Sequence, residues 1–151
     1  MDLSKKAQTG RYSKKNKKIR ITSADKWFSI FIRIRDIVSG EYCMCITCRK
    51  LIHWKYQAHC GHFATRGKLM TRYDERNCHA QCAKCNIDND GEQAKHGLAI
   101  DRLYGHGTAQ KLIDLSEIRG QKEHTREAIK LFSREYREKA RELAKIKGIE
   151  I

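Results

Sequence analysis

Two closely spaced pairs of cysteines form the clearest metal-binding pattern in this 151-residue sequence. The pairs are Cys45-Ile-Thr-Cys48 and Cys82-Ala-Lys-Cys85. A two-residue gap in a tight turn lets both thiolates face one ion, and two such turns complete a tetrahedral zinc site. The total of seven cysteines is odd and the N-terminal residues lack the apolar stretch of a secretory signal, which favours a reducing compartment over a disulfide framework. We therefore predict one structural Zn²⁺, bound by Cys45, Cys48, Cys82 and Cys85.

The 33 residues between the two pairs are rich in side chains suited to phosphodiester hydrolysis. That reaction needs a base for water, an oxygen-binding metal for the leaving oxygen, and cations that hold the backbone. A neutral imidazole can be the base, and Asp, Asn or His can hold Mg²⁺ or a transition metal. The candidates for these two tasks are His53, His59, His62, Asp74, Glu75, Asn77, His79 and, directly after the last cysteine, Asn86. Arg66, Lys68, Arg72 and Arg76 are the candidates for phosphate contacts.

The charge distribution predicts a polyanionic partner. The chain has a formal net charge of +14, and residues 1–20 alone hold eight Lys or Arg against one Asp. Residues 49–84 add a net charge of +6, whereas residues 86–120 carry −2. Concentrated basic regions of this kind favour nucleic acid over a merely solvated surface, and the N-terminal contacts would include Lys14, Lys15, Lys17 and Lys18. We expect no membrane partner, because no apolar run approaches the ~20 residues that span a bilayer.

Hydrophobic spacing predicts an α+β fold in which helices surround the cysteine pairs. Ser23 is a favourable N-cap for a helix over residues 23–38, whose apolar side chains recur every three or four positions. Alternation of Ile52, Trp54 and Tyr56 predicts a strand after the first pair. Residues 64–77 are predicted to form a basic, irregular loop.

The second half of the chain is predicted to be helical. A short helical turn follows the second cysteine pair, a helix ends at Gly105, and a small helix covers 109–118. A long charged helix covers about 122–147 and has a narrow apolar stripe, which suits either pairing with a second copy or packing on its own core. The stripe consists of Ile129, Phe132, Tyr136, Ala140, Leu143 and Ile146.

These elements divide the chain into three parts. Residues 1–22 form a basic flexible arm, residues 23–118 a zinc-stapled core, and residues 119–151 the C-terminal charged helix. The three cysteines outside the pairs are predicted to be small buried side chains. They are Cys43, Cys60 and Cys78.

The order of these residues resembles a known family. Cys45–Cys48 is followed by Gly61-His62-Phe63 and then by Arg72-Tyr-Asp74-Glu-Arg-Asn77-Cys-His79-Ala-Gln81-Cys82-Ala-Lys-Cys85-Asn86. This pattern is similar to the NinG (Rap) family of lambdoid phage recombination endonucleases over roughly residues 23–118. More distantly it resembles HNH, or ββα-metal, nucleases such as phage endonuclease VII. The resemblance implies an HNH-like core, cleavage of branched DNA such as Holliday junctions and D-loops, and action in the cytoplasm of the bacterial host.

The resemblance also implies roles for individual residues. The four paired cysteines match structural zinc ligands, and His62 matches the general base that activates water. Asn86 matches a ligand of the catalytic Mg²⁺ or Mn²⁺. The usual pattern has Asp directly before the base, where this chain has Gly61. The missing ligand is therefore either His59, which we prefer, or Asp74.

The resemblance also suggests roles for two further residues of the motif, Asn77 and His79. Asn77 is expected to orient the loop or His62 through hydrogen bonds. His79 is either a phosphate contact, a group behind the metal ligands, or a structural histidine beside the second cysteine pair.

Two other functions remain open at this stage. A non-catalytic zinc-finger protein would bind DNA through the same basic regions. The absence of an Asp-His pair is the feature that supports this alternative. An HNH nuclease of homing or restriction type is the other, although the short chain leaves little room for a sequence-reading module. A homodimer is expected for a resolvase, since two symmetric cuts need two sites.

Overall fold

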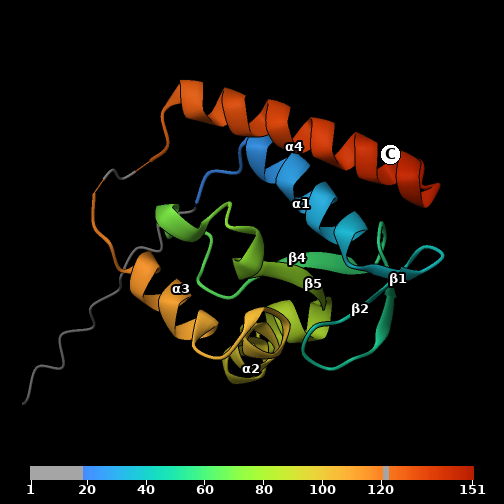
Figure 1. Ribbon diagram of the computed structural model, residues 1–151, viewed down its shortest axis with the longest axis horizontal. Coiled ribbons are helices and arrows are strands. Elements are labelled where there is room, and N and C mark those ends of the chain that lie inside the picture. The colour runs from blue at the N-terminus through green and yellow to red at the C-terminus, as the bar shows by residue number, and fades with distance from the viewer. Residues whose placement is uncertain (1–18, 121–122) are drawn as a thin grey trace, which may run out of the picture.

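The computed structural model describes residues 19–120 and 123–151, and it places two pairs of helices on opposite sides of small antiparallel sheets (Figure 1). Helices α1 (Ser23–Arg35) and α4 (Arg126–Lys147) lie side by side on one side of the strands. Helices α2 (Gln93–Tyr104) and α3 (Thr108–Ser116) lie on the other side. The mixed α and β composition that the sequence predicted is confirmed. The predicted arm residues Lys14, Lys15, Lys17 and Lys18 lie outside the described residues.

Helix α1 ends earlier than the sequence pattern indicated, and its N-cap is a different residue. Thr22, not Ser23, is the N-cap, and it forms a reciprocal capping box with Asp25. The expected helix through residue 38 ends at Arg35, because the carboxylate of Asp36 accepts the Ala80 backbone N–H at 2.7 Å. The chain then continues as strand β1.

The first cysteine pair lies on a three-stranded antiparallel sheet. Strands β1 (Ile37–Ser39), β2 (Tyr42–Met44) and β3 (Leu51–His53) are neighbours in that order. The loop between β2 and β3 carries Cys45 and Cys48, and the Cys45 N–H donates to the Lys50 carbonyl at 2.8 Å. Strand β3 ends at His53, so it is shorter than the strand predicted through residue 56.

Strands β4 (Ala58–His62) and β5 (Cys78–Cys82) form a second, two-stranded sheet. Their antiparallel register pairs His62 with Cys78 and Ala58 with Cys82, which brings the histidine-rich strand beside the second cysteine pair. The connection between them is the predicted loop, and it contains two single turns of 3₁₀ helix, η1 (Leu69–Thr71) and η2 (Glu75–Asn77).

The helical predictions after the second cysteine pair are confirmed in outline. A π-helical turn, η3 (Lys84–Asp88), follows Cys82, and α2 ends at Gly105, whose φ of 103° is accessible mainly to glycine. Helix α3 matches the small helix expected over 109–118 within two residues at either end. The segment that follows leads to α4, which begins at Arg126 rather than near residue 122 because Thr125 provides its N-cap.

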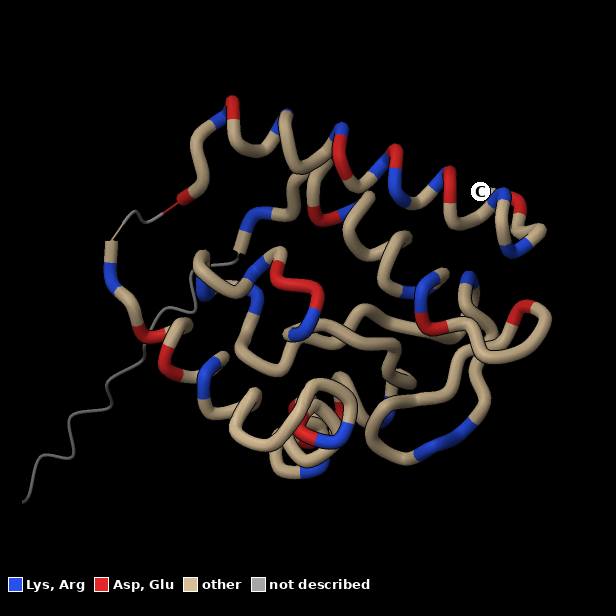
Figure 2. Tube along the Cα trace, in the orientation of Figure 1, with Lys and Arg blue, Asp and Glu red and all other residues tan. Residues whose placement is uncertain are grey.

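Helix α4 packs most of its apolar stripe against α1 of the same chain, whereas Ile146 at the end of the stripe is exposed. Tyr136 and Ala140 are buried in a cluster with Phe28, Phe31 and Ile32 of α1. Charges of both signs alternate along the rest of α4 (Figure 2). Of the two uses predicted for the stripe, packing on its own core is the one observed. Among the described residues, no helix combines the length and apolarity needed to cross a membrane.

Candidate metal centre and adjacent cavity

The four paired cysteines converge on one point between the two sheets. The Sγ atoms of Cys45, Cys48, Cys82 and Cys85 all lie within 4.8 Å of one another, and those of Cys48 and Cys82 are 3.8 Å apart. Cys45 follows β2, Cys82 ends β5, and Cys85 lies in η3. The backbone N–H of Ile46 donates to the Ala80 carbonyl at 3.0 Å, which holds the two cysteine-bearing segments together. The predicted set of four ligands is thus brought together by the fold.

Electrostatics at this cluster favour a bound cation. Burial opposes ionisation of Cys45, but N–H and O–H donors around its sulfur lower the pKa of this thiol to about 6. Burial and the neighbouring sulfurs instead raise the pKa of Cys85 to about 12. Four sulfurs this close cannot all be thiolates without a compensating positive charge, and Zn²⁺ supplies it with the tetrahedral geometry that four thiolates prefer. The cluster can therefore hold a zinc ion.

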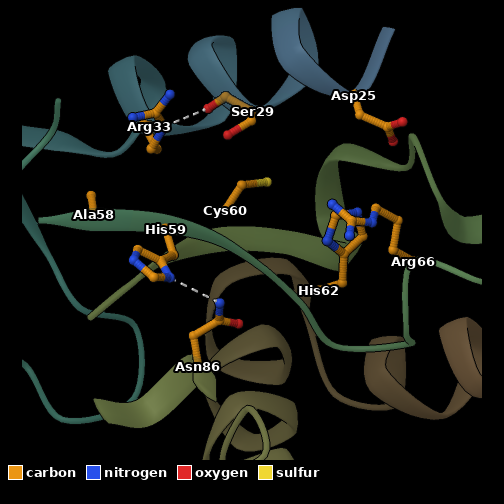
Figure 3. Close-up of a pocket in the computed structure, with 9 residues that line it drawn as sticks. All are labelled: Asp25, Ser29, Arg33, Ala58, His59, Cys60, His62, Arg66 and Asn86. Carbon is orange, nitrogen blue, oxygen red and sulfur yellow. Dashed lines mark hydrogen bonds between the residues drawn. The ribbon is translucent and has the colours of Figure 1, made fainter. Parts of the chain in front are cut away.

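A polar cavity of about 340 Å³ lies between α1 and β4, next to this cluster. Figure 3 shows side chains from α1 above, from β4 and the residues after it, and from η3 below, with His59 directed toward Asn86 on the side of β4 away from α1. It is lined by Asp25, Ser29, Arg33, Ala58, His59, Cys60, His62, Arg66 and Asn86.

His59 and Asn86 meet in this cavity. The Asn86 Nδ2 atom lies 3.3 Å from His59 Nδ1, and the amide oxygen points away from the imidazole (Figure 3). Asp74, the other candidate for the third ligand, does not line the cavity. Its carboxylate instead accepts hydrogen bonds from the Arg76 guanidinium at 2.7 and 3.0 Å, which outweigh partial burial and lower the pKa of Asp74. The fold therefore pairs His59, not Asp74, with Asn86.

His62 lines the same cavity and is held as a neutral imidazole. Its Nε2 lies 3.1 Å from the backbone oxygen of Arg72, and since a carbonyl only accepts, Nε2 carries the hydrogen and Nδ1 keeps a lone pair. Burial lowers the pKa of His62 to about 4, despite the opposing effect of that carbonyl. The imidazole is thus unprotonated throughout the neutral pH range.

Asn77 orients the loop that follows His62. Its side chain is fully buried, accepts the Ala64 backbone N–H at 2.7 Å, and donates to the carbonyls of Ala64 and Thr71 at 2.9 and 3.0 Å. These bonds close the loop between β4 and β5 on itself. Asn77 reaches the cavity only through this loop, so its place is that of a positioning residue rather than of a catalytic one.

Two predicted phosphate contacts, Arg72 and His79, are wrong because both side chains are buried. The Arg72 guanidinium donates to both carboxylate oxygens of Asp25 at 2.7 and 2.9 Å. His79 is 2% exposed and lies 3.2 Å from ring nitrogen Nε2 of His96 and 3.2 Å from the Tyr104 hydroxyl. Among its alternatives, the structural histidine is the one observed.

The other basic side chains of this region remain near the surface. Arg66 lines the cavity, and Lys68 and Arg76 are partly exposed in ion pairs with Glu117 and Asp74. These three positions keep their predicted role as candidate phosphate contacts.

The site predicted from the sequence did not include the residues of α1 that line the cavity. Asp25, Ser29 and Arg33 recur every four residues along α1 and face the cavity together, although the helix is otherwise apolar on its buried side. This polar spacing of four was visible in the sequence and is the signal that could have identified them. Cys60 was also missed as a cavity residue, since a lone cysteine on a strand is ordinarily a core side chain.

Fold and site together define a small α+β domain with a four-cysteine cluster that could hold a zinc ion, and with a cation-lined cavity that contains His59 and Asn86. The family described as "Bacteriophage Lambda NinG protein" matches residues 3–147, and the chain belongs to this NinG family. Protein ninG of Salmonella phage P22 is 29% identical over 126 residues, which are 82% of this chain and 57% of the relative. The chain thus spans little more than half of that relative's length. No solved structure matches the chain.

Proposed function

We propose that this protein is a divalent-metal-dependent DNA endonuclease of the HNH type that cuts branched recombination intermediates. The observation that carries the proposal is that His59, Asn86, His62 and two arginines line one cavity. Membership of a phage family and the net charge of +14 are consistent with a DNA partner in the cytoplasm of an infected cell.

His59 and Asn86 are the residues that would hold the catalytic ion. Asn86 offers an amide oxygen and His59 an imidazole nitrogen, a mixed donor set that suits Mn²⁺ better than Mg²⁺, which prefers oxygen alone. When bound, such an ion stabilises the charge that develops on the leaving 3′-oxygen. A Cβ at Gly61, where the usual pattern has Asp, would overlap the end of the Gln81 side chain, so an Asp at this position would require Gln81 to move. The partner of Asn86 in the proposed site is His59 on the same strand.

His62 is the general base of the proposed reaction. The Arg72 carbonyl fixes its ring through Nε2, and Nδ1 takes the proton from the attacking water. Burial keeps this imidazole neutral, whereas the charge of a surface histidine follows the pH of the solution.

Arg33 and Arg66 are the cations that would hold the DNA backbone within the cavity. Arg33 is anchored by bonds to the carbonyls of Ser29 and Trp54 at 3.1 and 3.0 Å, which leave part of its guanidinium for a phosphate. Arg66 enters from the loop after β4, on the opposite side of the cavity from Arg33 (Figure 3). The basic residues 1–20 would add affinity without structural preference, by releasing counterions from any phosphate track.

Resolution of a four-way junction by this protein would need two active sites. A homodimer remains part of the proposal on that ground. Its interface would lie mainly outside the apolar stripe of α4, because most of that stripe packs on α1.

A non-catalytic zinc-finger protein is the second candidate. The absence of an Asp at position 61 favours it. Both candidates bind DNA, but only the nuclease cuts it.

The deciding experiment compares a synthetic four-way junction with a linear duplex of the same sequence, each incubated with the zinc-loaded protein. We expect nicks near the junction's branch point with Mn²⁺ or Mg²⁺, none with EDTA, and little cleavage of the linear duplex. Binding of both DNAs without cleavage in any divalent metal would replace the nuclease by the zinc-finger alternative.

A further inference from the structure

Three metal-ligating side chains outside the four-cysteine cluster also converge. Cys60 and His62 lie on the same face of β4, and Cys78 is the β5 partner of His62 in the antiparallel register. The sulfur atoms of both cysteines and a ring nitrogen of His62 all lie within 4.8 Å of one another. The proposed reaction uses neither of these cysteines.

We propose that Cys60, His62 and Cys78 form a second metal site, selective for thiophilic ions such as Zn²⁺, Cd²⁺ or Cu⁺. Two thiolates and an imidazole are soft or borderline donors, which bind these ions in preference to Mg²⁺ or Mn²⁺. Two thiolates also balance the charge of one divalent ion. The site is thus chemically distinct both from the four-sulfur cluster and from the His59–Asn86 pair.

The orientation of His62 supports a role as a ligand. A metal-bound histidine ordinarily donates its other ring N–H to a carbonyl or carboxylate, which fixes the ring and directs the lone pair at the ion. The Arg72 carbonyl already has this place, 3.1 Å from Nε2, so Nδ1 is the nitrogen left for a metal.

An ion can reach this site from the cavity. Cys60 and His62 both line the cavity, whereas Cys78 is fully buried behind them. Figure 3 shows the Cys60 side chain projecting from β4 toward α1, within the space bounded by Ser29 and Arg33. Three protein ligands would leave a fourth position for water or a DNA phosphate on the cavity side.

On the proposed function, a metal ion bound by Cys60, His62 and Cys78 would block the general base. The lone pair at Nδ1 cannot hold an ion and accept a proton from water at the same time. Excess Zn²⁺ should therefore inhibit cleavage, and raising the Mn²⁺ concentration should not restore it, because the two ions occupy different residues.

The site itself is tested by metal binding, without reference to activity. Reduced full-length protein is loaded with ¹¹³Cd²⁺, and bound cadmium is counted by elemental analysis and resolved by ¹¹³Cd NMR, whose chemical shift reports the number of sulfur ligands. We expect two ions per chain and two resonances, one typical of four sulfurs and one typical of two sulfurs with nitrogen. Cys60→Ala and Cys78→Ala should each abolish the second resonance and leave the first.

Cys43→Ala is the matched control, since this buried thiol donates to the Arg33 carbonyl and belongs to neither cluster. It should keep both resonances. Persistence of the four-sulfur resonance shows that each variant is folded. A single ion in the parent protein, or a second resonance that survives in Cys60→Ala, would overturn the proposed site. Two bound ions without inhibition by Zn²⁺ would uphold the site and instead contradict His62 as the base.

Discussion

At the scale of single residues, burial decides what each histidine can do. Desolvation lowers the pKa of His62 to about 4 while its side chain still lines the cavity, whereas the more deeply buried His79 is enclosed by His96 and Tyr104. The family resemblance predicted that His62 and Asn86 belong to one site. Neither could distinguish His79 and Arg72 as core residues, because burial depends on neighbours that are distant in sequence.

The lowered pKa of His62 predicts that the rate of DNA cleavage changes little as the pH falls from 7.5 to 5.5. An imidazole with the ordinary value near 6.5 would lose about tenfold of its base form between pH 7.5 and 5.5, whereas one near 4 stays neutral. Single-turnover cleavage at saturating Mn²⁺ should change by less than about twofold over this range, with zinc content checked at each pH. A tenfold fall would show that the working base titrates normally. The same shift makes stability fall from pH 6.5 toward 4, since the unfolded chain takes up the proton first.

The buried pair of Asp25 and Arg72 should be costly to break. Both side chains are less than 10% exposed, so Asp25→Ala leaves an uncompensated guanidinium in the core and should lower the unfolding free energy by about 3–5 kcal/mol. Glu117→Ala removes an exposed pair with Lys68 and should cost less than about 1 kcal/mol. Denaturant titration of both variants measures the difference. Equal effects would contradict the burial of the pair.

At the scale of elements, periodicity located the helices well and their ends less well. The helices over 109–118 and before Gly105 were predictable because apolar spacing and a terminal glycine agree there. The end of α1 was not, since it depends on Asp36 bonding to the backbone of β5, 44 residues away. The partner of the α4 stripe was likewise undetermined, because a stripe shows which face is buried but not against what.

Lys147 joins the ends of α1 and α4. Its Nζ donates to the carbonyls of Ile34, Arg35 and Ile37 at 2.9–3.1 Å. Lys147→Met should therefore lower the unfolding free energy by about 1–3 kcal/mol, since three carbonyls lose their donor.

Lys145→Met is the control for this prediction, because it removes an exposed charge from the same helical turn. It should change stability by less than about 0.5 kcal/mol. Thermal or urea unfolding of the two variants compares them directly, and a similar loss in both would assign the effect to helix charge instead of to the bridge between α1 and α4.

At the scale of the whole molecule, the four-cysteine cluster and hydrophobic packing together join the parts of a small core. The four-cysteine cluster joins the first sheet to β5 and η3, and three modest apolar clusters cover the remainder. The sequence predicted this cluster fully because ligand type and spacing are encoded locally. It could not predict the cavity wall supplied by α1, which depends on how α1 lies over β4.

Removal of zinc should therefore unfold the protein rather than merely inactivate it. Cys85→Ser should lose the ion and most of the cooperative thermal transition, as should the parent after treatment with a strong chelator. Cys43→Ser, a buried cysteine outside the cluster, should keep both. Circular dichroism with metal analysis on the same samples measures this outcome. A cooperative transition in zinc-free parent protein would contradict the structural role of the metal.

The most direct test of the account is single-turnover cleavage of a four-way junction by His62→Ala. Zinc content, circular dichroism and junction affinity are measured on the same sample, because loss of the fold would mimic loss of the base. Cleavage should fall by about 10²–10⁴, the usual contribution of a positioned general base, while zinc and junction binding stay at the parent level. Near-normal cleavage by this zinc-loaded variant would contradict His62 as the base and the cavity as the active site built around it.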